Sequence, residues 1–225
     1  MNVSVVIPVF DGEKYLAAAI ESILGQTVPP AAIIVVDDGS SDGSRAVAES
    51  FGSSVRCIAR THAGGAATLN HGIEVVATEL IAFLDADDLW LPTKLEAQLA
   101  ELAARPEIDL VFGHVQQFLS PDLTPERAAR LICPTEPQPG RYASALLARR
   151  AVFDLVGLLA TDLRTGWFID WSMRAVDLGV RHVMLPEVVV KRRIHGQNLG
   201  LRDKDGRVDY LEVLKRVVER RRQGS

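Results

Sequence analysis

Short apolar runs alternate with longer amphipathic segments through the first half of this chain. The runs Val3–Val9, Ile33–Val36 and Leu80–Leu84 contain almost no polar residue, which is typical of strands buried on both faces. The segments between them repeat apolar residues at helical spacing. Because strands joined by helices usually pair in parallel, the pattern predicts an α/β fold with a mostly parallel, Rossmann-like sheet flanked by helices.

Strands and helices are also expected in the rest of the chain, where they alternate less regularly. Further strands are expected at Val55–Ala59, Asp109–Val115, Tyr142–Leu147, Val180–Leu185 and Val188–Ile194. Helices are expected over residues 16–24, 42–51, 66–77, 92–104, 149–156, 167–178 and 210–222. The proline-rich stretch 120–140 exceeds the length of ordinary connections, which predicts a lid or a poorly ordered excursion.

Composition excludes several classes of protein. Apolar residues make up 48% of the 225 residues and charged residues 24%, so the chain is not disordered. No apolar run approaches the roughly 20 residues of a membrane span, and the N-terminus lacks the basic segment of a signal peptide. We therefore expect a cytoplasmic protein without a transmembrane segment, in which Cys57 and Cys133 are reduced thiols.

Charge is distributed unevenly along the chain. Residues 1–110 carry 6 basic and 16 acidic side chains, whereas residues 191–225 carry 11 basic and 5 acidic ones. The acidic half could bind a divalent cation, and the basic C-terminal segment could bind phosphate or an anionic surface. The alternative is that both are ordinary solvated faces without a ligand. The basic stretches lack interleaved aromatic residues, so no nucleic-acid partner is expected.

Two acidic clusters directly follow predicted strands. Asp37 and Asp38 end the second strand, and Asp85-Ala86-Asp87-Asp88 ends the fourth. Ligands of parallel sheets gather at the carboxyl ends of the strands, so these clusters indicate a functional edge. Three adjacent carboxylates need a cation or hydrogen-bond donors to offset their repulsion. A hard divalent ion bound by these carboxylates would keep coordination positions open for water and phosphate. The alternative is a solvent-exposed acidic turn that binds no ion.

Three sequence motifs follow one another along the chain: VSVVIPVFDGEKYLAAAIESILGQT, then IIVVDDGSSDGS, then ELIAFLDADDLWLPTKLE. Together they resemble glycosyltransferase family 2, whose members have the A-type glycosyltransferase fold. Downstream, GWFIDWSMRA and VVVKRRIHGQN are similar to the acceptor-side acidic motif and the late basic–histidine segment of the family. The resemblance runs from Val3 to about Asn198. It implies an inverting, metal-assisted transfer of sugar from a nucleotide-diphosphate sugar, with a UDP-sugar expected, to an acceptor hydroxyl or thiol.

The resemblance also implies roles for individual residues. The nucleotide-binding residues would be Pro8, Phe10, Glu13, Asp38, Asp85 and Ala86. Asp87 and His195 would bind a divalent cation, Mn²⁺ or Mg²⁺, and Asp170 would be the catalytic base. The alternatives are a packed or surface histidine at 195 and a helix-surface aspartate at 170. Residues 1–115 would form the nucleotide-sugar-binding half, 116–200 the acceptor-binding half of the same domain, and 201–225 a C-terminal amphipathic helix.

Two positions depart from the family pattern. Leu69 stands where the family often has an arginine that holds the nucleotide, which leaves Arg60, Lys94 or Arg193 as replacements. Ile169 stands at the first acidic position of the ED-type motif. Because of these departures, a nucleotide-sugar-binding protein without catalytic activity remains an alternative function.

A second alternative is a phosphohydrolase of the haloacid-dehalogenase type, because residues 81–87 mimic its apolar run and DxD nucleophile. That motif normally lies on the first strand and continues with Gly and Thr. Dehydrogenase and P-loop functions are excluded because neither glycine-rich motif is present. The acceptor (glycan, natural product or peptide) and the formation of a homodimer stay open.

Overall fold

The computed structural model describes residues 1–198 and 206–223. Residues 199–205, where the predicted C-terminal segment begins, and 224–225 lie outside the described residues. The strands are β1 Val3–Val9, β2 Ala32–Asp37, β3 Arg56–Ala59, β4 Leu80–Phe83, β5 Leu89–Trp90, β6 Leu110–Leu119, β7 Gln138–Pro139, β8 Leu147–Arg149 and β9 His182–Ile194. The α-helices are α1 Glu13–Leu24, α2 Ser44–Ser50, α3 Gly65–Val75, α4 Lys94–Ala104, α5 Pro125–Ala128, α6 Ala151–Val156, α7 Trp167–Asp177 and α9 Gly206–Gln223, with 3₁₀ turns η1 Gly52–Ser54 and η2 Ala143–Ala145.

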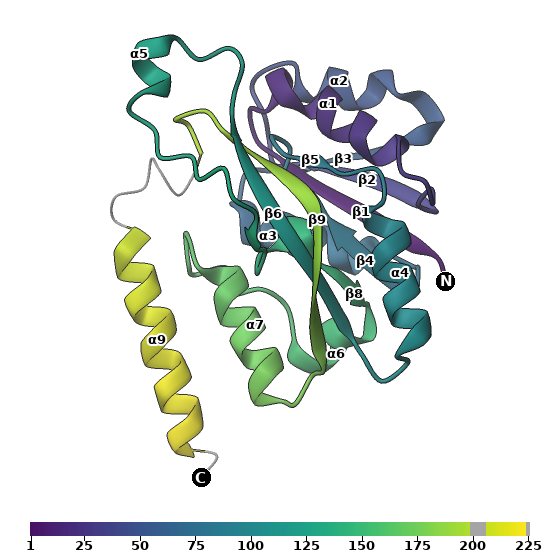
Figure 1. Ribbon diagram of the computed structural model, residues 1–225, viewed down its shortest axis with the longest axis vertical. Coiled ribbons are helices and arrows are strands. Elements are labelled where there is room, and N and C mark those ends of the chain that lie inside the picture. The colour runs from purple at the N-terminus through teal and green to yellow at the C-terminus, as the bar shows by residue number, and fades with distance from the viewer. Residues whose placement is uncertain (199–205, 224–225) are drawn as a thin grey trace.

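The strands of the described residues form one sheet in the order β3-β2-β1-β4-β8-β6-β9-β5, and β7 pairs with β6 (Figure 1). Strands β1 to β4 are mutually parallel, as are β6 and β9. β8 runs antiparallel to both β4 and β6 and joins the two parallel parts. The predicted α/β fold with a mostly parallel sheet is therefore confirmed. In the described part of the chain, no helix has the length and apolar character needed to cross a bilayer.

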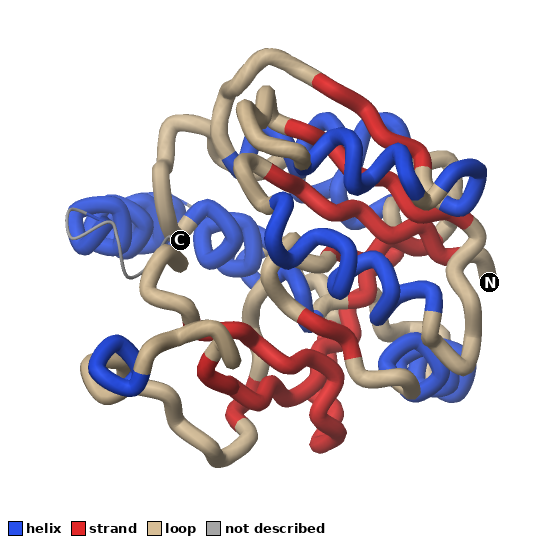
Figure 2. The backbone as a smooth tube through the Cα atoms, turned by 90° about the horizontal axis from the view of Figure 1, so that it is seen from above, coloured by secondary structure: helices blue, strands red, loops and turns tan. Residues whose placement is uncertain are grey.

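Each face of the sheet is covered by helices (Figure 2). Alternate residues of β1 enter different cores: Val5 and Ile7 pack with the buried side chains of α1 and α4, whereas Val6 packs with those of α3, α6 and α7. This alternation explains why the first strand is apolar at every position except Ser4, since both of its faces are buried. α9 lies beside α7 at the edge of the molecule (Figure 1).

Three predicted elements differ in the structure. Tyr142–Leu147 is not a strand but the turn η2 followed by β8. The turn lets the Ser144 hydroxyl accept the Asp85 N–H at 3.0 Å and its carbonyl accept the Trp90 indole N–H at 3.0 Å. The strands predicted at 180–185 and 188–194 are one strand, β9, whose register shifts against β6 between residues 112 and 114. The shift accommodates Pro186, which has no N–H to donate to a ladder. The two-residue strand β5 is too short to leave a sequence pattern.

Lys94 lies in the core rather than at the nucleotide edge. Its side chain is wholly buried; its Nζ donates to Gln98 Oε1 at 2.6 Å and to the Leu146 carbonyl at 3.2 Å. It also lies 4.2 Å from the centre of the Trp90 ring. The prediction that Lys94 replaces the arginine missing at position 69 is therefore wrong.

Burial makes Lys94 a source of pH-dependent stability. It lowers the pKa of Lys94 well below 10.5, so folding releases the proton that the unfolded chain carries there. Between the folded and unfolded pKa values the unfolded state binds more protons. The free energy of unfolding should therefore rise by up to about 1.4 kcal/mol per pH unit from this group.

Lys94→Met, which nearly conserves volume, is expected to remove this contribution. Melting temperatures of the two proteins, measured from about pH 7 to pH 10, should converge or cross as the wild type gains stability. Parallel profiles would show that Lys94 keeps its proton in the folded state.

Candidate active site

The carboxyl ends of β1, β2 and β4 lie side by side because these strands are neighbours in the parallel part of the sheet. Pro8 is paired with Val36 near the end of β1, and Asp37 ends β2. The cluster that begins at Asp85 follows β4. The structure thus brings the two predicted acidic clusters to one edge of the sheet.

The loops after β1 and β2 are bound to each other through acidic side chains. Glu13 Oε2 accepts the Gly43 N–H at 3.0 Å, and the Glu13 N–H donates to Asp42 Oδ2 at 3.0 Å. Asp11, which has a positive φ of 49°, accepts the Ser41 N–H at 2.8 Å. Glu13, which is predicted at the border of the nucleotide pocket, thus has one carboxylate oxygen engaged in holding the second loop.

Asp38 organises the loop that leads into α3. Its side chain is 3% exposed, and its two oxygens accept the N–H groups of Ala63 at 3.0 Å and Gly64 at 2.8 Å. His62 Nδ1 lies 2.9 Å and Arg60 Nε 3.5 Å from the same carboxylate. The side chain predicted to contact the base edge is thus occupied by the protein's own loop.

Phe10 and His62 form an aromatic surface above this loop. The ring of Phe10 is half exposed and lies 4.2 Å from the imidazole of His62, at an interplanar angle of 34°. Because a planar base has a π-face that such rings can pack against, this surface can bind a nucleobase without hydrogen bonds to its edge.

The carboxylates after β4 are crowded and only partly neutralised. Burial and the charge of Asp87 raise the pKa of Asp85 to about 6. The same causes raise the pKa of Asp88 well above its ordinary value, although Asp88 Oδ1 accepts the Arg193 N–H at 2.9 Å. The excess of negative charge leaves this cluster able to bind a cation.

Asp87 lies at the centre of a small polar group contributed by the end of β9 and the residues after it. His195 Nε2 lies 2.9 Å from Asp87 Oδ2, and Asn198 Nδ2 donates to the same oxygen at 3.2 Å. Asn198 Oδ1 accepts the His195 N–H at 2.9 Å, which closes the turn that carries both side chains. Asp87 and His195, predicted as a pair from distant motifs, are therefore brought into contact.

Arg193, near the end of β9, joins this strand to the Asp87 segment. Its Nε donates to the Asp87 carbonyl at 2.9 Å, and the side chain is 7% exposed. The guanidinium carbon lies 4.7 Å from the ring centre of Tyr15 and 4.8 Å from that of Phe118. Two aromatic faces and a carbonyl thus fix a buried cation beside the acidic cluster.

Residues 4–156 match the family model described as glycosyl transferase family 2. The chain belongs to this family. An uncharacterised glycosyltransferase of Rickettsia typhi is 30% identical over 206 residues, which cover 86% of this chain and 64% of the relative. UDP-Glc:α-D-GlcNAc-diphosphoundecaprenol β-1,3-glucosyltransferase WfgD of Escherichia coli is 34% identical over 116 residues, 51% of this chain and 46% of that enzyme. The chain thus spans less than two thirds of the length of these curated relatives.

Solved structures agree with the fold of this family 2 chain. The crystal structure of S. aureus TarS 1–349 in complex with UDP has a TM-score of 0.73 and 17% identity, covering 96% of this chain and 64% of that one. The same protein in complex with UDP-GlcNAc has a TM-score of 0.72 and 18% identity, covering 89% of this chain and 61% of that one. The likeness establishes the A-type glycosyltransferase fold, and the family match removes the phosphohydrolase alternative.

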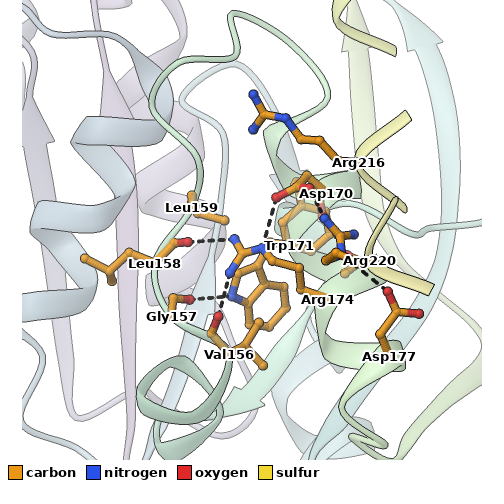
Figure 3. A network of polar contacts seen from close by, with 12 residues as sticks. Val156, Gly157, Leu158, Leu159, Asp170, Trp171, Arg174, Asp177, Arg216 and Arg220 are labelled. Carbon is orange, nitrogen blue, oxygen red and sulfur yellow. Dashed lines mark hydrogen bonds and ion pairs between the residues drawn. The ribbon is translucent and has the colours of Figure 1, made fainter. Parts of the chain in front are cut away.

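Asp170 lies in the first turn of α7 and is engaged by two arginines (Figure 3). It is 3% exposed, with Oδ2 at 3.0 Å from Arg174 Nε and Oδ1 at 3.1 Å from Arg220 Nη1 of α9. Arg174 also donates to the carbonyls of Val156 at 2.5 Å and Leu158 at 2.7 Å. In this arrangement each carboxylate oxygen of Asp170 is paired with an arginine, and the side chain is closed to solvent.

The donor set around Asp87 fits a divalent cation that is shared with a substrate. Among the described residues, no group of three or more His, Cys, Asp or Glu side chains is arranged to hold a metal alone. Asp87 and His195, 2.9 Å apart, offer an oxygen and a nitrogen. These two side chains would leave the other positions of the ion to phosphate and water, from which Mg²⁺ commonly takes its ligands.

Some residues of the site had no sequence signal or a misleading one. Asn198 follows His195 by three residues, a spacing that suits a side-chain-closed turn and could have been noticed. Leu69 is buried in the core, and Arg60 donates to the Ala67 carbonyl beside Asp38. Of the three basic residues suggested as replacements for the missing arginine, Arg193 contacts the cluster after β4, Arg60 lies beside Asp38 and Lys94 is in the core.

Proposed function

We propose that this protein transfers a sugar from a nucleotide-diphosphate sugar to an acceptor hydroxyl or thiol with inversion at the anomeric carbon. Membership of glycosyl transferase family 2 supports the reaction class. The observation that carries the proposal is the contact between Asp87 and His195 at the carboxyl edge of the sheet. It gathers, at one place, a carboxylate and an imidazole from segments 108 residues apart.

The nucleotide would bind at the ends of β1 and β2. Phe10 and His62 would pack against the base, and Asp38 would act by holding the loop that carries His62. Pro8, Glu13 and the segment Asp85-Ala86 would line the remainder. A UDP-sugar is the first donor to test, because the E. coli relative is named for UDP-Glc and TarS was solved with UDP and with UDP-GlcNAc.

Asp87 and His195 would hold a divalent cation, Mn²⁺ or Mg²⁺, against the diphosphate. When bound, the ion would supply Lewis-acid stabilisation of the charge that develops on the leaving diphosphate. Arg193 would keep the Asp87 loop in place through its hydrogen bond to the Asp87 carbonyl. Asn198 would orient the carboxylate of Asp87 by donating a hydrogen bond to Oδ2.

Asp170 is proposed as the base that takes the proton of the acceptor. Its helix begins close to the nucleotide loops, since the ring of Trp167 lies beside Gly65 at the start of α3. For this role Arg220 must leave the carboxylate, because Asp170 is 3% exposed and a base has to come within hydrogen-bond reach of the acceptor hydroxyl. The E. coli relative is named for a lipid-linked sugar acceptor, so a polyprenyl-diphosphate sugar is the first acceptor to test.

The second candidate is a nucleotide-sugar-binding protein without transferase activity. The two arginines on Asp170 favour it, because they occupy the only proposed base. The apolar side chain of Leu69 favours it too, since leucine cannot supply the charge of the arginine that the family often has at this position.

A thermal-shift panel of UDP, UDP-glucose and UDP-N-acetylglucosamine, with and without Mn²⁺, tests the donor site. At a ligand concentration of 100 times Kd, binding adds about 2.7 kcal/mol, which corresponds to a rise of about 5–10 °C in Tm for a chain of this size. We expect this rise only with Mn²⁺ present. No rise with any of the three nucleotides would refute both candidates, and a rise without UDP release on any acceptor would favour the second.

A further inference from the structure

The hydroxyl of Tyr142 is a buried polar group without a partner. Within the described part of the chain, three side-chain atoms are buried and make no hydrogen bond: Glu101 Oε1, Tyr142 OH and Arg220 Nη2. Glu101 is nevertheless ion-paired with Arg105, and the other nitrogens of Arg220 bind carboxylates. Tyr142 is therefore the side chain in this set whose only polar group is unmatched.

An unmatched buried hydroxyl is costly. Its hydrogen bonds to water are lost on folding and not replaced, a penalty that a phenylalanine at the same place would avoid. Such groups are rare in folded proteins, and each calls for a ligand, a bound water or another specific reason.

The location of Tyr142 indicates a ligand of the acidic edge. It begins the turn that carries Ser144, the side chain that accepts the Asp85 N–H. On the other side, the Arg192 guanidinium lies 5.9 Å from the centre of the Tyr142 ring. Tyr142 is thus placed between the end of β4 and the end of β9, where the donor's reactive part is proposed to bind.

The charge around Tyr142 restricts what its hydroxyl can bind. Burial, followed by the charges of Asp88 and Asp85, raises the pKa of Tyr142 well above 10.0, so the hydroxyl keeps its proton and is available as a donor. The same carboxylates disfavour an anionic acceptor placed directly against it. A neutral oxygen that accepts one hydrogen bond, such as the hydroxyl of a sugar, meets both requirements.

We propose that Tyr142 is a donor-binding residue whose hydroxyl donates a hydrogen bond to a hydroxyl group of the transferred sugar. The inference rests on the proposed function. It goes beyond that function by separating recognition of the sugar, through Tyr142, from recognition of the nucleotide, through the Phe10 surface.

Tyr142→Phe tests this inference through binding, without an acceptor. Affinities of wild type and variant are measured by calorimetry for UDP, UDP-glucose and UDP-N-acetylglucosamine in the presence of Mn²⁺. We expect the affinity for UDP to be unchanged and that for the preferred UDP-sugar to fall about three- to tenfold, the value of one hydrogen bond. The ligand-free Tm should stay level or rise, because the variant loses no bond and buries no unmatched hydroxyl.

Tyr210→Phe is the matched control, since the same atom is removed from a tyrosine that is 45% exposed on α9. It should bind all three nucleotides as the wild type does. Tyr142→Phe with unchanged affinity for every UDP-sugar would overturn the inference and indicate that the hydroxyl binds a water. An equal loss for UDP and UDP-sugar, or a ligand-free Tm several degrees lower, would also overturn it. A wild type that binds none of the nucleotides would refute the proposed function itself and the inference with it.

Discussion

Replacing Asp87 with asparagine is expected to lower turnover about a hundred- to a thousandfold and to abolish the Mn²⁺-dependent part of UDP binding. The substitution removes the charge from the carboxylate that lies 2.9 Å from His195 and 3.2 Å from Asn198. An asparagine keeps the size and one carbonyl oxygen, so Asn198 retains an acceptor. The loss should therefore come from the cation rather than from the fold, and Lewis-acid stabilisation of a leaving group is worth several kcal/mol.

The measurements are UDP release and the thermal shift with UDP, each with and without Mn²⁺. Asp154→Asn is the control, because Asp154 is an exposed carboxylate paired with Arg150 one helical turn away. Asp154→Asn should keep the wild-type UDP release and thermal shift, since surface ion pairs contribute about 0–1 kcal/mol to stability. If Asp87→Asn retained a full Mn²⁺-dependent shift, Asp87 and His195 would be a simple ion pair and the cation site would lie elsewhere.

The parts of this molecule that could be predicted from the sequence are those where local pattern and burial agree. β1 is predicted at Val3–Val9, where it lies, because a strand buried on both faces is apolar at nearly every position. The acidic edge was predicted because Asp38 and Asp85 follow β2 and β4 directly, and parallel neighbours end at one edge. Neither inference needs knowledge of contacts between distant residues.

Contacts between distant segments could not be predicted in the same way. Asp38 was expected to face a ligand, but four groups from residues 60–64 surround it, since loop backbone N–H groups need acceptors once buried. Lys94 is suggested as a replacement for the arginine missing at position 69, but no local pattern indicates that its side chain packs on Trp90. Asp170 and Arg220 are 50 residues apart, and no local pattern links them.

Asp170→Asn is expected to destabilise the fold by about 2–4 kcal/mol, which would lower Tm by roughly 5–15 °C. The change leaves Arg174 and Arg220 without their shared carboxylate in a site where Asp170 itself is 3% exposed. The expected cost lies near the lower end for buried pairs because the two arginine side chains are 20% and 29% exposed. Asp177→Asn is the control: it removes a carboxylate from the same helix that also pairs with Arg220, but one that is 21% exposed.

Arg220→Met separates the two roles that Asp170 could have. Methionine keeps an apolar stem between α9 and α7, removes the cation 3.1 Å from Asp170 Oδ1, and leaves Arg174 in place. If Asp170 is the base, freeing this oxygen should preserve or increase turnover of the folded enzyme, and Asp170→Asn should abolish turnover even at temperatures where it is fully folded. If Asp170 only joins α7 to α9, both variants should lower Tm, while turnover per folded molecule stays at the wild-type value. That second result would remove Asp170 from the mechanism and leave the ion pairs of Figure 3 as a structural connection.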